Sequence, residues 1–104
     1  MPKRPLRPEE RALIEALLAK VAGGKKYSIP EEAGALGDSG LQLSDEGEHA
    51  EDLVEATFMD DDRRAVYLTL TANDKGALYE LDIWKVDFSP LKRYPAPGEL
   101  RFDD

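Results

Sequence analysis

Three stretches of alternating apolar and polar residues constrain this chain more than any other feature of its sequence. They cover about residues 53–59, 65–72 and 77–88, and they share the two-residue period of a half-buried β-strand. Residues 73–76 (Asn-Asp-Lys-Gly) lie between the last two and predict a tight hairpin turn. The polar run 60–64 predicts a longer loop. The pattern therefore predicts a three-stranded antiparallel meander.

The register of the two predicted hairpins follows from their loop lengths. We expect Met59 to pair with Ala65 in the first hairpin and Ala72 to pair with Ala77 in the second. Both pairings bring the apolar residues of the three strands to one face, and a one-residue slip would destroy this agreement. The predicted apolar face comprises Val54, Ala56, Phe58, Val66, Leu68, Leu70, Tyr79, Leu81 and Ile83.

The same register predicts which polar side chains share the opposite face of the sheet. The predicted cross-strand rows are Glu55, Thr69 and Glu80, then Thr57, Tyr67 and Asp82. Three carboxylates and a tyrosine therefore lie together on this face, which stays open unless residues 25–52 cover it.

The N-terminal part of the chain predicts one helix, from about Pro8 to Ala22. Proline is favoured at the first helical position, and Glu9 and Glu10 complement the positive end of the helix dipole. The glycines at 23–24 are a typical helix end. One apolar stripe, which would cover the apolar sheet face, comprises Leu13, Ile14, Leu17, Leu18 and Val21. We therefore predict an α+β fold, an N-terminal helix packed on an antiparallel β-sheet that contains the meander.

The remaining segments have weaker patterns. Residues 27–29 and 41–43 each have the composition of a short strand, which would either extend the sheet or cover its open face. Residues 44–52 predict an exposed, mobile acidic loop. The proline-rich residues 91–104 predict an extended tail. The side chains expected to pin this tail to the domain are Tyr94, Leu100 and Phe102.

The alternation changes phase near the end of the third predicted strand. After Ile83, the apolar positions become Trp84, Val86 and Phe88, and Lys85 becomes a polar position. Such a change indicates a bulge or a strand that crosses the sheet edge. It predicts that Trp84 packs at that edge and that Lys85 faces solvent.

Composition limits the chain to one domain with few routes to catalysis. The 104 residues include no cysteine, which excludes disulfides, thiolate nucleophiles and thiolate metal sites. The single histidine, His49, and the run Asp60-Asp61-Asp62 lack the spacing of zinc or calcium ligands, and no phosphate-loop or serine-hydrolase motif is present. We expect no catalytic residues and no cofactor. Without a membrane-length apolar run or a signal peptide, we expect no membrane partner and a cytoplasmic location.

The net charge of −8 is concentrated in the middle of the chain. Residues 31–62 carry twelve Asp or Glu and no Lys or Arg, whereas residues 63–104 carry seven of each sign. This charge would repel nucleic acid and steer a basic protein towards the domain. A solvated segment that only improves solubility would explain the same charge.

Two stretches resemble a family of small bacterial proteins. Residues 78–91 read LYELDIWKVDFSPL, and residues 4–10 read RPLRPEE ahead of apolar pairs at 13–14 and 17–18. The family is catalogued as a domain of unknown function. The resemblance implies a shared fold and implies no catalytic residues.

These observations favour a non-enzymatic protein-binding module, such as a bacterial immunity protein that neutralises a basic toxin. Its expected contact residues are Glu46, Glu48, Asp52, Glu55, Asp60, Asp61, Asp62, Tyr67, Glu80 and Asp82. One alternative is a subunit of a homo-oligomer or larger assembly, with residues 84–88 at the interface. Another is a weak hydrolase that uses Glu55 and Glu80, about 9–10 Å apart across Thr69, as a carboxylate pair.

Overall fold

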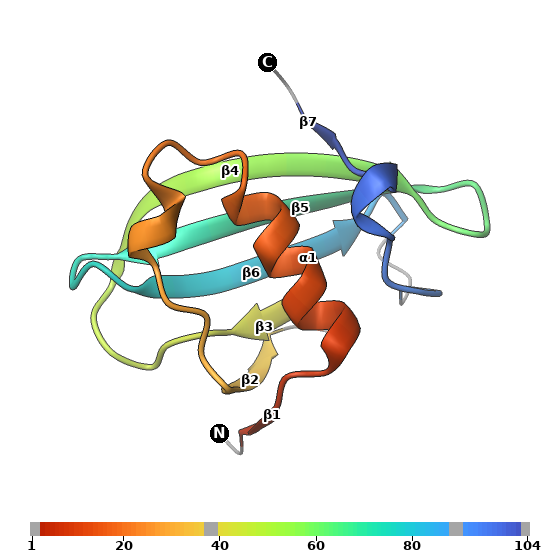
Figure 1. Cartoon of the computed structure of the whole chain (residues 1–104). Coiled ribbons are helices and arrows are strands. Elements are labelled where there is room, and N and C mark those ends of the chain that lie inside the picture. Colours follow the sequence, from red (N-terminus) through yellow and green to blue (C-terminus); the bar gives the residue numbers. More distant parts are fainter. Residues whose placement is uncertain (1–2, 37–39, 88–90, 103–104) are drawn as a thin grey trace.

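The computed structural model describes residues 3–36, 40–87 and 91–102. Within these residues, one α-helix packs against an antiparallel sheet of seven strands, which confirms the predicted α+β fold (Figure 1). The elements are β1 (Arg4–Pro5), α1 (Pro8–Leu18), the 3₁₀ turn η1 (Gly24–Lys26), β2 (Glu32–Leu36), β3 (Gly40–Gln42), β4 (His49–Met59), β5 (Ala65–Asn73), β6 (Leu78–Lys85), the 3₁₀ turn η2 (Pro97–Glu99) and β7 (Arg101–Phe102). The strand order is β1-β2-β3-β6-β5-β4-β7.

The core lies between α1 and one face of the sheet. Leu13, Ile14 and Leu17 of the helix are fully buried, as the predicted stripe requires. The sheet contributes buried side chains from β4, β5 and β6, which lie under the helix in Figure 1. These are Ala56, Phe58, Val66, Leu68, Leu70, Ala72, Leu78, Leu81 and Ile83. We call the side of the sheet away from α1 the open face.

The first predicted hairpin is confirmed residue by residue. Met59 pairs with Ala65, and Val54 pairs with Leu70. The β4–β5 ladder has two register shifts, one between His49 and Glu51 and one between Asp52 and Val54, and both lie in the first half of β4.

The second hairpin is shifted from its predicted register. Ala72 pairs with Leu78 and not with Ala77, because the turn is closed by a hydrogen bond from the Asn73 N–H to the Ala77 carbonyl. The Asn73 side chain favours this turn, since its Oδ1 accepts hydrogen bonds from the N–H groups of Lys75 and Ala77. Gly76 takes the left-handed conformation that the turn requires, with φ of 81°.

A β-bulge in β6 follows from this shift. Between the pairs Ala72–Leu78 and Leu70–Leu81, two residues of β6 face only Thr71 of β5. The Thr71 hydroxyl fills the gap, because it accepts a hydrogen bond from the Glu80 N–H at 3.1 Å and donates one to the Glu80 carbonyl at 3.3 Å. Tyr79, predicted on the apolar face, is half-buried outside the core cluster.

The predicted change of phase after Ile83 is wrong. The alternation continues, so that Lys85 is buried with 2% exposure while Trp84 remains 42% exposed. Two aspartates of the β4–β5 turn neutralise the buried ammonium group, which is the physical reason that lysine can occupy an inward position. Phe88, the last residue of the predicted strand, lies outside the described residues.

The helix ends at Leu18, four residues before its predicted end. Residues 19–22 form turns in which the Lys20 and Val21 N–H groups bond to the carbonyls of Leu17 and Leu18. Gly24 then lies so close to the Leu18 carbonyl that a side chain at this position would collide with it. The chain therefore reverses direction earlier than its apolar stripe indicates.

Residues 25–52 mainly extend the sheet. β3 pairs with β6 through Leu41 and Leu81, and β2 pairs with β3. The strand predicted at 27–29 is not formed: Tyr27 follows η1 and is buried in the core. β4 begins at His49, so strand structure occupies the second half of the segment that we expected to be a loop.

The C-terminal segment folds back onto the domain. β7 pairs with Ala56 and Thr57 of β4, and Leu100 is buried at 9% exposure. The Tyr94 hydroxyl donates a 2.9 Å hydrogen bond to Glu10, which the sequence places 84 residues away. All three residues predicted to pin the tail pack against the core.

The Glu10 side chain forms hydrogen bonds with residues from both the N-terminal and the C-terminal segments of the chain. Its buried carboxylate accepts two 2.7 Å hydrogen bonds from Arg4, one from the Arg7 backbone N–H and one from Tyr94. Burial raises the pKa of this carboxyl, but these hydrogen bonds outweigh burial and lower the pKa to about 2. Glu10 is therefore a fully ionised, fully hydrogen-bonded group.

Candidate binding face

At the end of the sheet near the C-terminus of β6, the open face carries three cross-strand rows. The rows differ in chemistry, from acidic through aromatic to apolar. In order they are Glu55, Thr69 and Asp82; Thr57, Tyr67 and Trp84; Met59, Ala65 and Val86. The first two rows correct the prediction, because the shift in β6 moves Asp82 to the expected place of Glu80 and Trp84 to that of Asp82.

Tyr67 and Trp84 form a stacked aromatic pair on this face. They are direct cross-strand partners, and their ring centroids lie 4.6 Å apart with an interplanar angle of 19°. Tyr67 is 37% exposed and Trp84 is 42% exposed. Large aromatic side chains contribute most of the binding energy at many protein interfaces, so an exposed stacked pair is a candidate centre for one.

The aromatic pair has an apolar neighbour on one side. Met59 is 57% exposed and Val86 is 43% exposed. Val86 lies beside Ala65 because its N–H donates to the Ala65 carbonyl at 3.1 Å. Together with the two rings, they form an exposed apolar strip, which is a feature of interaction surfaces.

On the other side of the aromatic pair, the face is hollowed. A shallow hollow of about 260 Å³ lies between the acidic row and the aromatic row. The residues that line it are Glu55, Ala56, Thr57, Tyr67, Leu68, Thr69 and Trp84. It thus combines one carboxylate, two threonine hydroxyls and an aromatic wall.

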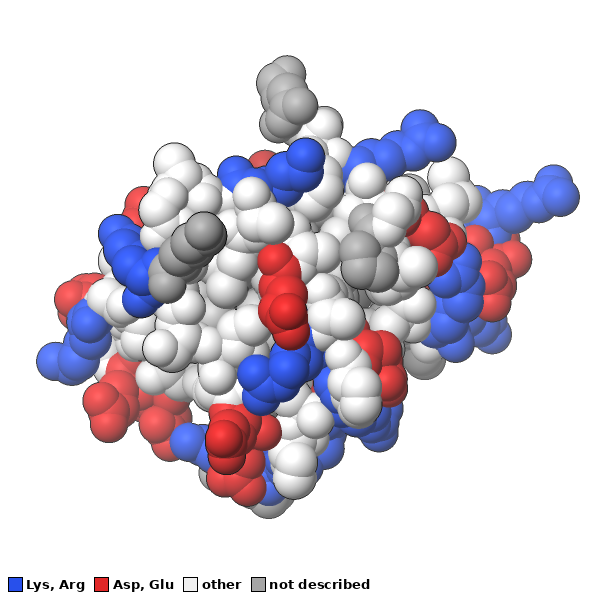
Figure 2. Space-filling view, in the orientation of Figure 1, with Lys and Arg blue, Asp and Glu red and all other residues white. Residues whose placement is uncertain are grey.

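The surface around α1, on the opposite side of the molecule, differs from the open face in the distribution of its charged side chains. There, Lys and Arg lie beside Asp and Glu over the surface around α1 (Figure 2). Next to the three rows of the open face, register places the basic residue Arg101 beside Thr57 at the outer edge. The three rows themselves, all within the described residues, contain two carboxylates and no Lys or Arg.

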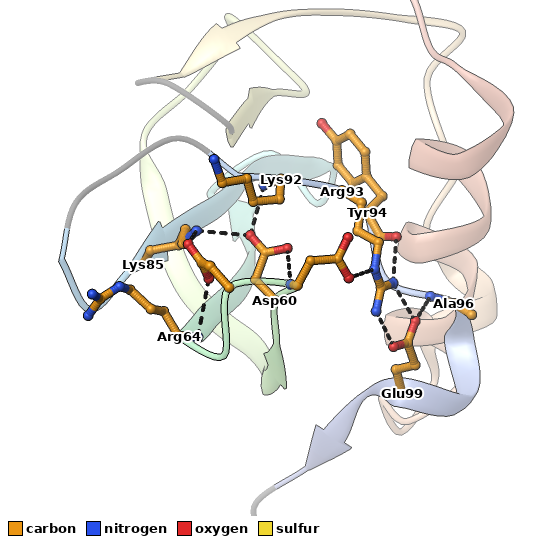
Figure 3. A network of polar contacts seen from close by, with 10 residues as sticks. Asp60, Arg64, Lys85, Lys92, Arg93, Tyr94, Ala96 and Glu99 are labelled. Atoms are coloured by element: carbon orange, nitrogen blue, oxygen red, sulfur yellow. Dashed lines mark hydrogen bonds and ion pairs between the residues drawn. The ribbon is translucent and has the colours of Figure 1, made fainter.

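Lys85 lies on the core side of β6, directly behind this face. Its ammonium group is 3.0 Å from Asp60 and 2.7 Å from Asp62 (Figure 3). Burial lowers the pKa of Lys85, but the hydrogen bonds to Asp62 and Asp60 raise it above its ordinary value. Asp60 also accepts hydrogen bonds from the backbone N–H groups of Asp61 and Lys92, both at 2.8 Å.

Asp61 takes part in a second internal network. Arg93 bonds to Asp61 at 2.6 Å and to both carboxylate oxygens of Glu99 at 2.7 and 2.6 Å (Figure 3). Glu99 also accepts the Ala96 N–H, and its pKa is lowered to about 2, chiefly by Arg93. The three aspartates that we expected to contact a partner therefore hold the β4–β5 turn to β6 and to the C-terminal segment.

The remaining expected contact residues lie in two other places. Glu46 and Glu48 are in the exposed connection before β4, which packs beside the β5–β6 turn through Asn73 and Asp74. Asp52 is exposed and contacts His49 at 2.8 Å. Glu80 is half-buried beside Gln42, so it cannot form the carboxylate pair with Glu55 that we predicted across Thr69.

The structure thus brings together Glu55, Tyr67 and Asp82 and separates them from the other expected residues. The sequence reasoning placed Thr57 and Thr69 on this face correctly and missed Trp84. Continued alternation through residue 86 would have found Trp84, but hydrophobicity favoured the opposite phase. Among the described residues, no group of three or more His, Cys, Asp or Glu is arranged to hold a metal ion. No described helix is long and apolar enough to cross a membrane.

The fold and this face define a small α+β protein whose sheet is covered by a helix on one side and open on the other. The chain belongs to the family catalogued as a domain of unknown function (DUF6984), whose model matches residues 3–95. This membership confirms the resemblance to an uncharacterised family. No curated protein and no solved structure matches the chain.

Proposed function

We propose that this domain is a non-enzymatic binding module that takes a basic protein on its open face, as an immunity protein does when it neutralises a basic toxin. The exposed Tyr67–Trp84 stack beside the carboxylates of Glu55 and Asp82 is the observation that carries the proposal. Aromatic anchors give affinity when they are desolvated, and flanking charges select the partner and accelerate its approach.

The charge of the chain supports a basic partner. The net charge is −8, and the carboxylates that approach solvent include those of the connection before β4. Glu46, Glu48 and Asp52 lie at the far end of the sheet from Trp84, so in this proposal they steer the partner and make few contacts with it. Steering acts over about a Debye length, roughly 10 Å at 0.1 M salt.

The size of the face is compatible with such a complex. The domain measures 37 × 33 × 23 Å, and its broad side can supply the roughly 800 Å² that each partner buries in a standard interface. The absence of cysteine and the family resemblance support the cytoplasm of a bacterium as the location that we propose.

Affinity capture followed by a quantitative binding assay tests this proposal. The immobilised chain and its Trp84→Ala variant would be exposed to an extract of the native source, and captured proteins would be identified and purified. We expect a protein with a basic isoelectric point, retained by the wild type and lost by the variant. Its affinity should fall steeply between roughly 50 mM and roughly 500 mM salt. Capture of an acidic protein, or an affinity unaffected by salt and by Trp84→Ala, would overturn the proposal.

Self-association is the second candidate, and the exposed apolar strip favours it. Met59, Val86 and Trp84 would be buried in a dimer formed through the open face. Such a dimer would also bring together two copies that each carry a net charge of −8, which is unfavourable. Light scattering distinguishes the two: a stable dimer that Trp84→Ala dissociates would support this candidate in place of the first.

A further inference from the structure

The hollow beside Tyr67 has the chemistry of a site for one organic cation. Its walls include the Glu55 carboxylate, the Thr57 and Thr69 hydroxyls and the aromatic stack, and none of the seven residues that line it is basic. We infer that this hollow is a seat for a guanidinium group, an arginine side chain of the partner. The inference rests on the proposed function, because it assigns that partner's anchoring residue.

The spacing of the rows fits such a group. Glu55 and Thr57 are two residues apart on β4, so their Cα atoms are separated by about 7 Å. A planar cation in the hollow can lie on the face of the Tyr67 ring that Trp84 does not cover and still reach the Glu55 carboxylate, because both residues line the hollow. Cations are attracted to aromatic faces within about 6 Å of the ring centroid. The stacked Trp84 supports the Tyr67 ring at 4.6 Å and limits its movement.

The composition of the hollow disfavours other ligands. An anion would be repelled by Glu55 and by Asp82 in the same row. A purely apolar group would remove water from the Glu55 carboxylate without replacing its hydrogen bonds. A calcium or magnesium ion would need about six oxygen ligands, whereas the hollow supplies a single carboxylate.

A guanidinium group suits the hollow better than an ammonium group. It is planar, it stacks on aromatic rings, and it is more weakly hydrated than an ammonium ion. Its several N–H donors can also reach hydroxyl oxygens on both rows, here those of Thr57 and Thr69. Arg101 lies across Thr57 from Tyr67, so its charge weakens cation binding at this seat.

Trp84 gives a direct readout, since it is the only tryptophan of the chain and lines the hollow. The probes are two blocked tripeptides, acetyl-Gly-Arg-Gly-amide and its citrulline analogue, which differ in charge and hardly in shape. We expect the arginine peptide to change the Trp84 fluorescence saturably at low salt, with an affinity about ten-fold higher than that of the citrulline peptide. Arg101→Gln should strengthen binding of the arginine peptide.

Matched variants distinguish binding of the arginine peptide in this hollow from its general attraction to the net negative charge of the chain. Glu55→Gln should remove the preference for arginine, whereas Glu15→Gln, which changes the net charge equally at an exposed position of α1, should leave it intact. Tyr67→Leu should also remove it, with circular dichroism confirming that each variant is folded. Equal titration by the two peptides, or equal losses in Glu55→Gln and Glu15→Gln, would overturn the seat.

The outcome also distinguishes this inference from the proposed function. If the peptides titrate alike while a basic protein is still captured through Trp84, the seat is overturned and the proposed function stands. If the arginine peptide binds as expected but the chain captures no basic protein, the proposed function is overturned and the seat is not.

Discussion

The ammonium group of Lys85 lies 3.0 Å from the carboxylate of Asp60, and both side chains are buried. This ion pair fixes the orientation of the end of β6. Because successive residues of a strand point to opposite sides, an inward Lys85 places Trp84 and Val86 outward. The buried Lys85–Asp60 ion pair and the exposed Tyr67–Trp84 stack therefore both follow from the direction in which the side chains at the end of β6 point.

Loss of the Lys85 charge should strongly destabilise the domain. Lys85→Met leaves Asp60 and Asp62 without their cation, and breaking a buried pair costs about 3–5 kcal/mol of unfolding free energy. Urea denaturation would measure the loss. Lys92→Met is the matched control, because Lys92 contributes its backbone N–H to Asp60 while the residue is exposed. If both variants had the same unfolding free energy, the Lys85 ion pairs would not stabilise the inward orientation of this side chain.

Stability should fall in acid partly through Glu10. Its pKa in the folded chain is about 2, below the ordinary value of 4.5. A lowered pKa adds stability above pH 4.5 that is lost as the pH falls towards 2, by about 1–3 kcal/mol. Urea denaturation at a series of pH values should therefore show a shallower acid slope for Glu10→Gln than for the wild type. Glu9→Gln, at the exposed neighbouring position, should keep the wild-type slope; equal slopes in the two variants would contradict the assignment.

Tyr94 should ionise later than an ordinary tyrosine. Burial and the hydrogen bond to Glu10 raise its pKa to about 12. Ultraviolet titration of the four tyrosines should resolve a late step that Tyr94→Phe removes. Tyr94→Phe should also lower the unfolding free energy by about 1 kcal/mol, because Glu10 loses one of its donors. A late step that persists in Tyr94→Phe would assign it to another tyrosine.

The negative potential at Trp84 can be measured by fluorescence quenching. Iodide should quench this tryptophan less efficiently, relative to neutral acrylamide, than its 42% exposure alone would allow. The double variant Glu55→Gln/Asp82→Asn should raise the iodide-to-acrylamide ratio. Glu46→Gln/Glu48→Gln, which removes the same charge at the far end of the sheet, should change it less. An equal change in both pairs would show that only the net charge matters.

The sequence predicted the candidate face only in part, for reasons that differ between residues. Glu55 and Tyr67 were placed correctly because the β4–β5 register follows from alternation on both strands. Asp82 was assigned to the wrong row because two one-residue shifts add up: the Asn73 side chain selects a turn one residue longer than expected, and β6 carries a bulge opposite Thr71. Trp84 was missed because its hydrophobicity favours burial. Its side chain is exposed because the neighbouring Lys85 side chain points into the core.

What the sequence alone determined was the local periodicity: an amphipathic N-terminal helix, three alternating strands and one exact register, all set by side chains near one another in the chain. Only the tertiary structure decided which charges are internal. Lys85 turns inward because Asp60 and Asp62, 25 and 23 residues earlier, close over it. Glu10 is buried because Tyr94 reaches it from 84 residues away. A charge can leave water only when its partners surround it, and partners so distant are brought together by folding alone.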